Sequence, residues 1–165
     1  MSIPEFVANL AKHPLLIPNR YNVMILGPEG VFDQAVSYNV ASVGIPARSL
    51  ATAERFIHGP NTKVPYVEIF DDLSLTFRLS ADMYERQLID QWMTKVGGEQ
   101  YASEYFDDIK GKVVIKVMHR DGQVMKTYNF WDAIPISLSD TALSQEASEP
   151  ATVTVQFAYH HYEWS

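Results

Sequence analysis

Residues 64–96 place a long alternating strand directly before one short amphipathic helix, and this order constrains the fold more than any other feature. Apolar and polar side chains alternate over residues 66–79, which is typical of a half-buried strand. The apolar positions on one face are Leu73, Leu75, Phe77 and Leu79. Asp71 and Asp72 interrupt the alternation, so we expect a bulge or bend at that point.

The helix carries its own start and stop signals. Asp82 is a suitable N-cap, Glu85 three residues later completes a capping box, and Gly97 provides a left-handed stop. Apolar residues recur at helical spacing as one stripe: Ile89, Trp92, Met93 and Val96. We therefore predict a helix over residues 83–96, about 21 Å long at a rise of 1.5 Å per residue. The stripe is expected to pack on a sheet rather than line a ligand pocket.

The rest of the chain reads as strands joined by turns. Further strands are expected at residues 20–26, 35–43, 112–119, 124–130 and 152–160. Apolar residues on both faces of 20–26 suggest burial on two sides, and Asp121-Gly122 is a hairpin signal. Residues 131–135 are expected to turn the chain outward, and 137–150 to form a polar connection. The prediction is a mainly β (α+β) fold, a sandwich or barrel of about six to eight antiparallel strands with one packed helix.

Two segments have little core of their own. Residues 1–18 form an expected N-terminal arm, because Pro14 and Pro18 prevent a long helix. Residues 47–63 read as an extended loop or hairpin, and long loops in compact domains are usually functional or bound to something. Charged residues of this loop are Arg48, Glu54, Arg55, His58 and Lys63.

Composition excludes several classes of function. The chain has 165 residues, a net charge of −7 and no cysteine, which predicts one domain over residues 1–165. An acidic chain disfavours tight nucleic-acid binding, and the lack of cysteine excludes disulfides, thiolate catalysis and thiolate zinc sites. We find neither a signal peptide nor an apolar run of about 20 residues. A soluble chain made in the cytoplasm, without membrane insertion, is expected.

Metal and catalytic patterns are weak. The five histidines are His13, His58, His119, His160 and His161. None forms a helical i, i+4 pair, and neighbours on a strand point to opposite faces, so a shared metal is not expected. Asp71-Asp72 and Asp107-Asp108 are carboxylate pairs that fit an acid/base couple or a divalent-metal site, but adjacent acids in turns are more often solvated. No catalytic residue, metal or cofactor is predicted.

Five segments in this order resemble the tail tube proteins of contractile-tailed bacteriophages. They are Pro18–Val23, Gly44–Pro46, Phe70–Phe77, the helix carrying Trp92, and Tyr128–Pro135. The resemblance extends over most of the chain, and the order of the segments supports it more than any single motif.

The resemblance implies a structural protein rather than an enzyme. Such proteins form hexameric rings that stack into a tube inside a sheath, with strands joined edge to edge in an inner barrel and loops linking the rings. The implied partners are copies of the chain itself, the sheath protein, and the baseplate and tail terminator proteins. Genomic DNA would pass without specific binding. The implied location is the tail of a virion, after synthesis in the host bacterial cytoplasm.

Two groups of residues are candidates for this role. Glu68, Asp71 and Asp72 lie on the long central strand and are candidate lumen-facing acids. A hexamer would carry 6 × −7 = −42 formal charges, which would repel phosphates if enough of them face the lumen. The charged residues of the 47–63 loop are the candidate contacts between subunits or rings.

Other interpretations remain open. A baseplate protein that initiates the tube has a similar fold, as do the tube proteins of type VI secretion and contractile bacteriocins. From other classes, a metal-dependent hydrolase would use the paired aspartates, and a lipocalin-type barrel would enclose an apolar cavity.

Overall fold

The computed structural model describes residues 3, 15–32, 34–55, 62–97, 106–144 and 149–165. Its strands are β1 Tyr21–Gly27, β2 Gly30–Val31, β3 Val40–Gly44, β4 Arg48–Arg55, β5 Thr62–Phe70, β6 Leu73–Arg78, β7 Gly111–Met118, β8 Val124–Leu138, β9 Thr152–Ala158 and β10 His161–Trp164. Its helices are α2 Gln34–Tyr38, α3 Tyr84–Gly97 and α4 Phe106–Ile109. The predicted mainly β fold with one substantial helix is confirmed.

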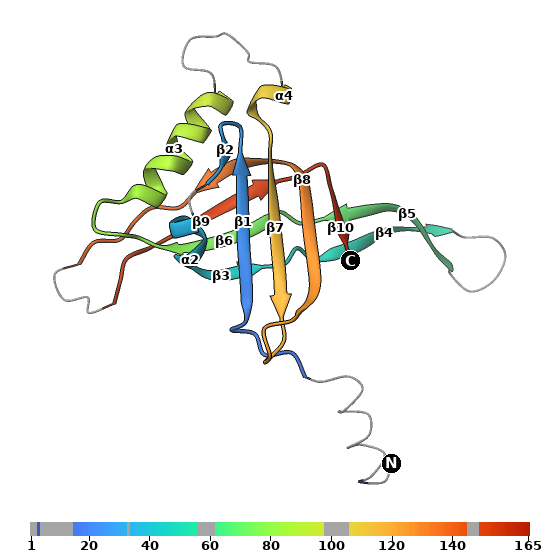
Figure 1. The fold of residues 1–165 in the computed structure, drawn as a ribbon. Helices are drawn as coiled ribbons and strands as arrows, with labels where there is room; N and C mark the ends of the chain where they lie inside the picture. Colours follow the sequence, from blue (N-terminus) through green and yellow to red (C-terminus); the bar gives the residue numbers. More distant parts are fainter. Residues whose placement is uncertain (1–2, 4–14, 33, 56–61, 98–105, 145–148) are drawn as a thin grey trace.

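Strand β8 belongs to two sheets that cross each other (Figure 1). The main strand order is β2-β1-β7-β8-β9-β6-β3, and β10 also pairs with β8. The first part of β8 pairs with β7 and β10, whereas its last part, Ile134–Leu138, pairs with β9. Between them Asp132 has a φ of 53°, and the register shifts on both sides. A bent, bulged strand of this kind forms the corner between two crossed sheets.

We name the two sheets by their central strands. The β1–β7 sheet contains β2, β1, β7, β10 and the first part of β8. The β6–β9 sheet contains the last part of β8 with β9, β6 and β3. The alternate residues between the sheets form the core: Val23, Ile25, Leu73, Leu75, Phe77, Val113, Ile115, Phe130, Val153, Val155 and Phe157.

Helix α3 closes one side of this core. Trp92 is 2% exposed, its ring centroid lies 5.8 Å from that of Phe157, and its indole N–H donates to the carbonyl of Ile109 at 2.8 Å. A Cβ on Gly111 would overlap both this indole ring and the carbonyl oxygen of Leu26, so only glycine fits there. The helix therefore covers the same face of β9 that the β1–β7 sheet covers.

The start of α3 differs from the predicted capping box. Met83, with φ 53°, takes the capping position, and its carbonyl accepts from the Gln87 amide at 3.0 Å. Glu85 is 2% exposed and reaches past Asp82 to Ser80, accepting from the Ser80 amide at 3.0 Å and hydroxyl at 2.7 Å. Asn39 donates a third hydrogen bond at 2.5 Å. Glu85 therefore contacts Ser80 instead of the predicted N-cap Asp82, because the chain turns at Ser80, two residues before Asp82.

These contacts set the charge of Glu85. Burial raises the pKa of Glu85, but hydrogen bonds from the Ser80 hydroxyl and amide, its own amide and Asn39 lower it more, so the net shift is downward. The Ser80 hydroxyl, 2.6 Å from the Asp82 carboxylate, likewise holds the pKa of Asp82 below its ordinary value. Both carboxyl groups are therefore ionised at neutral pH.

Four strand predictions need correction. The alternating segment 66–79 is two strands, because the chain bends at Asp71-Asp72 and places β5 and β6 in different sheets. Residues 34–38, at the start of the second predicted strand, form α2 instead. Residues 131–135 bend the chain at Asp132 but do not lead it out of the sheets, because β8 continues through them to Leu138. Strand β1 buries Val23 and Ile25 on one face but leaves Met24 38% exposed on the other.

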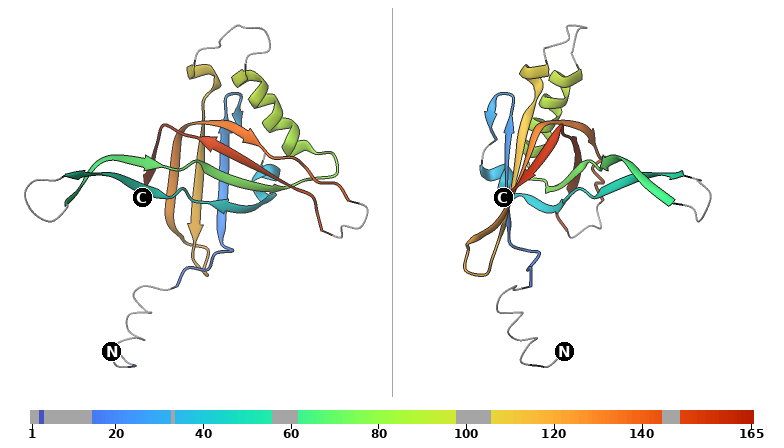
Figure 2. Two further views of the ribbon diagram at one scale, coloured as in Figure 1. Left: turned by 180° about the vertical axis from the view of Figure 1, so that it is seen from behind. Right: turned by 90° about the vertical axis from the view of Figure 1, so that its right-hand side faces the viewer.

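Beyond the sheets, β4 and β5 form a separate two-stranded hairpin that projects from the body (Figure 2). The interpretation of residues 47–63 as an extended hairpin agrees with β4 and the start of β5, and residues 56–61 lie outside the described part of the chain. The predicted N-terminal arm is described only at residue 3 and from residue 15 onward. No helix among the described residues is long and apolar enough to cross a membrane.

Candidate assembly surfaces

The β6–β9 sheet ends in two unpaired edges. In the described part of the chain, β3 pairs with β6 alone, and the last part of β8 pairs with β9 alone. The pairing between β7 and β8 stops at Gly111 and Ala133, so Ile134–Leu138 has no strand on that side. Unpaired backbone N–H and C=O groups at an edge are a template for pairing with another chain. The two edges flank a sheet of four strands.

The β4–β5 hairpin is exposed along nearly its whole length. All nine residues of β5 are exposed, among them Tyr66 at 70% and Ile69 at 48%. A lone two-stranded hairpin is marginally stable in water. Together with its exposed apolar residues, this makes the hairpin a candidate contact for another molecule.

A bulge places a set of small and β-branched side chains together on one face of the hairpin. The register skips Tyr66, because Val67 pairs with Ala51 and Pro65 pairs with Thr52. Directly paired residues share a face, so the bulge brings Val64 to the same side as Val67 and Ile69. We call this the hairpin apolar face: Ser49, Ala51, Ala53, Val64, Val67 and Ile69.

The opposite hairpin face carries most of the charges, together with Leu50 and Phe70. Arg48 lies 2.5 Å from the Glu68 carboxylate and 5.9 Å from the centroid of the Phe70 ring. Further along this face, Glu54 pairs in register with Lys63, whereas Arg55, paired with Thr62, lies on the side of the hairpin apolar face at its distal end. Of the predicted contact residues, four therefore lie on the hairpin, and His58 lies outside the described residues.

The three predicted lumen acids do not share one strand. Glu68 is on β5 beside Arg48, whereas Asp71 and Asp72 form the link between β5 and β6. The Tyr159 hydroxyl donates to the Asp71 carbonyl at 2.9 Å. Burial, followed by the charges of Tyr162, Asp72 and Asp71, raises the pKa of Tyr159 to about 12. Asp71 and Asp72 thus lie at the end of the β6–β9 sheet where β6 begins.

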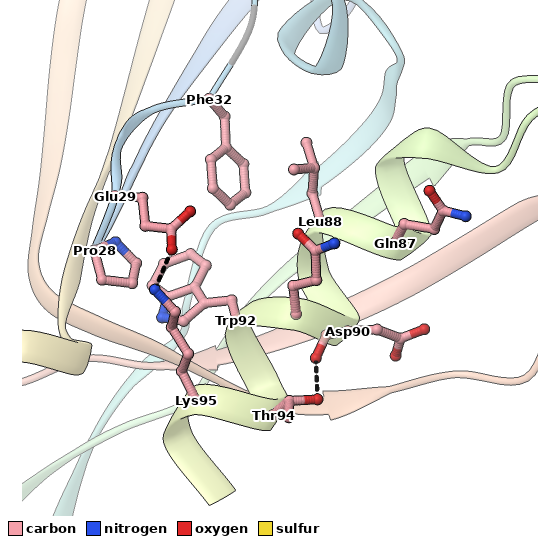
Figure 3. Close-up of a pocket in the computed structure, with 10 residues that line it drawn as sticks. Pro28, Glu29, Phe32, Gln87, Leu88, Asp90, Trp92, Thr94 and Lys95 are labelled. Atoms are coloured by element: carbon pink, nitrogen blue, oxygen red, sulfur yellow. Dashed lines mark hydrogen bonds and ion pairs between the residues drawn. The ribbon is translucent and has the colours of Figure 1, made fainter. Parts of the chain in front are cut away.

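A hollow of about 610 Å³ lies between α3 and the β1–β2 turn (Figure 3). Glu29 from the turn forms an ion pair with Lys95 of α3, and the rings of Phe32 and Trp92 meet edge to face at 5.6 Å. Of the predicted helix stripe, Ile89 and Trp92 are buried, and Met93 and Val96 pack partly buried against the core. These contacts hold α3 against the β1–β2 turn and the core, and the residues that line the hollow form no set of catalytic groups.

Metal-binding clusters are absent from the described residues. No three His, Asp or Glu side chains among them lie close enough to hold an ion. Asp71-Asp72 and Asp107-Asp108 lie on separate segments, and Asp107 forms an ion pair with Lys110 at 2.7 Å. His160 and His161 have ring planes at 88° to each other, and His161 lies 3.3 Å from Glu163.

Sequence and structure comparisons identify the class of protein. The phage tail tube protein family matches residues 16–165, so the chain belongs to that family. The predicted family is therefore confirmed, and it is a family of structural proteins rather than enzymes. No curated protein sequence matches the chain.

Solved structures share the fold at low sequence identity. A chain of the anti-feeding prophage baseplate, six-fold symmetrised, is 14% identical with a TM-score of 0.69, over 92% of this chain and 95% of that one. A chain of the sheath-tube complex of the extracellular contractile injection system PVC is 16% identical with a TM-score of 0.68, over 100% and 98%. A crystal structure of an Hcp protein is 14% identical with a TM-score of 0.57, over 87% and 89%.

Proposed function

We propose that this protein forms hexameric rings that stack into the inner tube of a contractile phage tail and conduct DNA during ejection. The observation that carries the proposal is the pair of unpaired edges on the β6–β9 sheet. In a ring, β3 of one subunit pairs with the last part of β8 of the next, and both edges disappear.

The size of the resulting barrel suits a conduit. Six copies of a four-stranded sheet give 6 × 4 = 24 strands. Barrels of about 16–18 strands already enclose an aqueous channel, so this barrel is hollow. Six-fold symmetry is supported by the symmetrised assembly of the similar baseplate chain.

The β4–β5 hairpin is the proposed link between subunits and rings. Its apolar face becomes buried against a neighbouring copy, which stabilises a hairpin that is marginal alone. Arg55, Glu54 and Lys63 lie towards its distal end, where charge pairing sets the register between rings. Arg48 instead joins β4 to β5 within the hairpin through Glu68 of its own chain.

The external partners are the sheath, baseplate and terminator proteins. Similar chains occur in structures described as a sheath-tube complex, a baseplate and a tube-terminating cap. These assemblies support a place for the chain in a contractile tail, and the proposal adds that this is the tail of a virion, made in a bacterial host.

The three acids remain proposed lumen residues, with their positions refined. Asp71 and Asp72 precede β6 and would give 6 × 2 = 12 carboxylates at one rim of the barrel. Glu68 contributes less field because Arg48 lies beside it. Changing all three to lysine should slow DNA passage without preventing assembly, and unchanged ejection would remove this assignment.

Electron microscopy of the concentrated purified protein tests the proposal. We expect stacked six-fold rings. The variant Val67→Asp/Ile69→Asp should stay folded by circular dichroism but form no stacks, while Glu29→Gln, in the turn beside α3, should still assemble. Monomers alone, at concentrations and salt conditions that favour assembly, would contradict the proposed function.

The similarity to a baseplate chain also favours a second role, initiation of the tube at the baseplate. An initiator forms one ring per tail, whereas a tube protein forms many. Quantitative mass spectrometry of purified tails separates the two by copy number.

A further inference from the structure

The face of the β6–β9 sheet that points away from the core is polar but nearly uncharged. The buried residues of β6 and β9 alternate with exposed or half-buried ones, and the strand pairing aligns the latter in rows. One row is Ser137, Gln156, Ser74 and Gly44, and the next is Thr154, Thr76 and Ser42. Within the second row, the hydroxyl groups of Thr76 and Thr154 lie 3.1 Å apart. We call these two rows the hydroxyl face.

Charge is confined to the ends of this face. Asp71 and Asp72 precede β6, and Arg78 is its last residue, paired with Thr152. Solvated strand faces commonly carry Lys and Glu, and one-fifth of this chain is charged. The lack of charge on both central rows is therefore a distinctive property of this face.

Ring closure determines which way the hydroxyl face points. The other face of the same sheet is covered by the β1–β7 sheet and by α3, whose Trp92 contacts Phe157. Because these layers add bulk to that side of the sheet, they fit on the outside of a ring, where the circumference is larger. If the proposed ring forms, the hydroxyl face is thus the surface left to bound the hollow.

We propose that the hydroxyl face, as the wall of the channel, neither binds nor repels the polyanion that passes. The inference rests on the proposed function and refines it, because the acidity of the chain then acts at the rim and on the outside rather than along the wall. DNA slides past hydroxyl and amide groups that exchange hydrogen bonds with water. Without a row of cations, no phosphate is held in place.

Adding one lysine to the wall tests this chemistry. Gln156 is exposed at the centre of a row, and Gln156→Lys adds six cations per ring. Met24→Lys is the matched control, because Met24 is 38% exposed on the outer face of the β1–β7 sheet. Wild-type, Gln156→Lys and Met24→Lys subunits are assembled with linear double-stranded DNA and then treated with nuclease. Protected DNA per subunit is measured at low and high salt.

The wild type and Met24→Lys should protect only background DNA. Gln156→Lys should protect at least tenfold more at low salt and lose this gain at high salt. Equal protection by the two lysine variants, when both form tubes, would show that Gln156 does not face the channel. Salt-sensitive protection by the wild type at the level of Gln156→Lys would show that the wall is not inert.

A cysteine variant tests the placement without adding charge. The chain has no cysteine, so Gln156→Cys and Met24→Cys each introduce a single thiol. In tubes, a small maleimide should label both, whereas a large polyethylene-glycol maleimide should label Met24→Cys alone. Labelling of Gln156→Cys by the large reagent along intact tubes would overturn the inference. Absence of tubes from the wild type, seen first by microscopy, would instead overturn the proposed function.

Discussion

Strands β5 and β6 are consecutive in the chain, separated by two aspartates, yet their surroundings are opposite. Strand β6 buries Leu73, Leu75 and Phe77 completely, and β5 leaves every residue exposed. Both contain alternating or β-branched apolar residues that suit a strand. The difference shows that the subunit completes its core at the β6–β9 sheet and leaves its hairpin uncovered.

The comparison also separates the free energy of folding of the subunit from the free energy of its assembly. Apolar burial in β6 stabilises the isolated subunit, because it removes side chains from water on folding. The hairpin apolar face contributes only when a second molecule covers it. Substitutions in β6 should therefore change the unfolding of the isolated subunit, whereas substitutions on the hairpin apolar face should change assembly.

A truncation in β6 should have the largest effect. Phe77→Ala should lower the free energy of unfolding by about 3–5 kcal/mol, because it leaves a cavity in a closed core. Tyr66→Ala, on β5 where the residue is 70% exposed, is the control and should cost less than about 1 kcal/mol. Urea unfolding followed by tryptophan fluorescence measures both, and similar losses would erase the distinction between the strands.

Loss of the buried carboxylate should come next. Glu85→Gln should cost about 1.5–3 kcal/mol at neutral pH, because it weakens charged hydrogen bonds to Ser80 and Asn39. The folded-state pKa of Glu85 is lowered, so its contribution is complete above the ordinary value of about 4.3 and is lost as pH falls through the lower folded value.

Unfolding measured across acidic pH checks this linkage. The wild type should lose more stability on acidification than Glu85→Gln does. Asp90→Asn, on the exposed side of the same helix, should follow the wild-type curve. Parallel curves for the wild type and Glu85→Gln would mean that this carboxyl group does not titrate differently on folding.

A smaller loss of stability is expected for removal of Lys112, which covers the partly exposed ring of Trp131. Lys112 Nζ lies 3.5 Å from the centroid of Trp131, which is 37% exposed. Lys112→Ala should cost about 0.5–1 kcal/mol through the lost cation–π contact. Lys116→Ala on the same strand face is the control, and equal effects in thermal unfolding would rule out a specific contact.

The hairpin should give the smallest effect on the subunit and a large one on assembly. Val67→Ser with Ile69→Ser should change the unfolding free energy of the isolated subunit by less than about 0.5 kcal/mol. The critical concentration for tube formation should rise at least tenfold, about 1.4 kcal/mol. Sedimentation of assembled tubes measures this, and an unchanged critical concentration would assign the face no role in assembly.

Much of the fold follows from local pattern. Alternation predicted β1, β7 and β9, and the Asp121-Gly122 turn lies between β7 and β8 with Gly122 at φ 83°. The helix begins at Tyr84, one residue after its predicted start. These features depend on neighbouring residues, so sequence was sufficient to predict them.

The candidate site was less predictable, because it depends on which surfaces stay uncovered. The charged residues of the 47–63 loop marked the hairpin, but its apolar face depends on the bulge at Tyr66. The acids were placed on one central strand, whereas the chain bends between them. No local signal marked the unpaired edges, because an edge is defined by the absence of a neighbouring strand.

By itself, the sequence determined a mainly β chain with one capped helix, an acidic charge and membership in a structural family. Only the tertiary structure decided that β8 passes from one sheet to the other, that Asn39 reaches Glu85 46 positions away, and that β3 pairs with β6 on one side and with no described strand on the other. The physical reason is that helices and turns depend on residues that are close in the sequence. Burial and strand pairing depend on residues that only folding brings together.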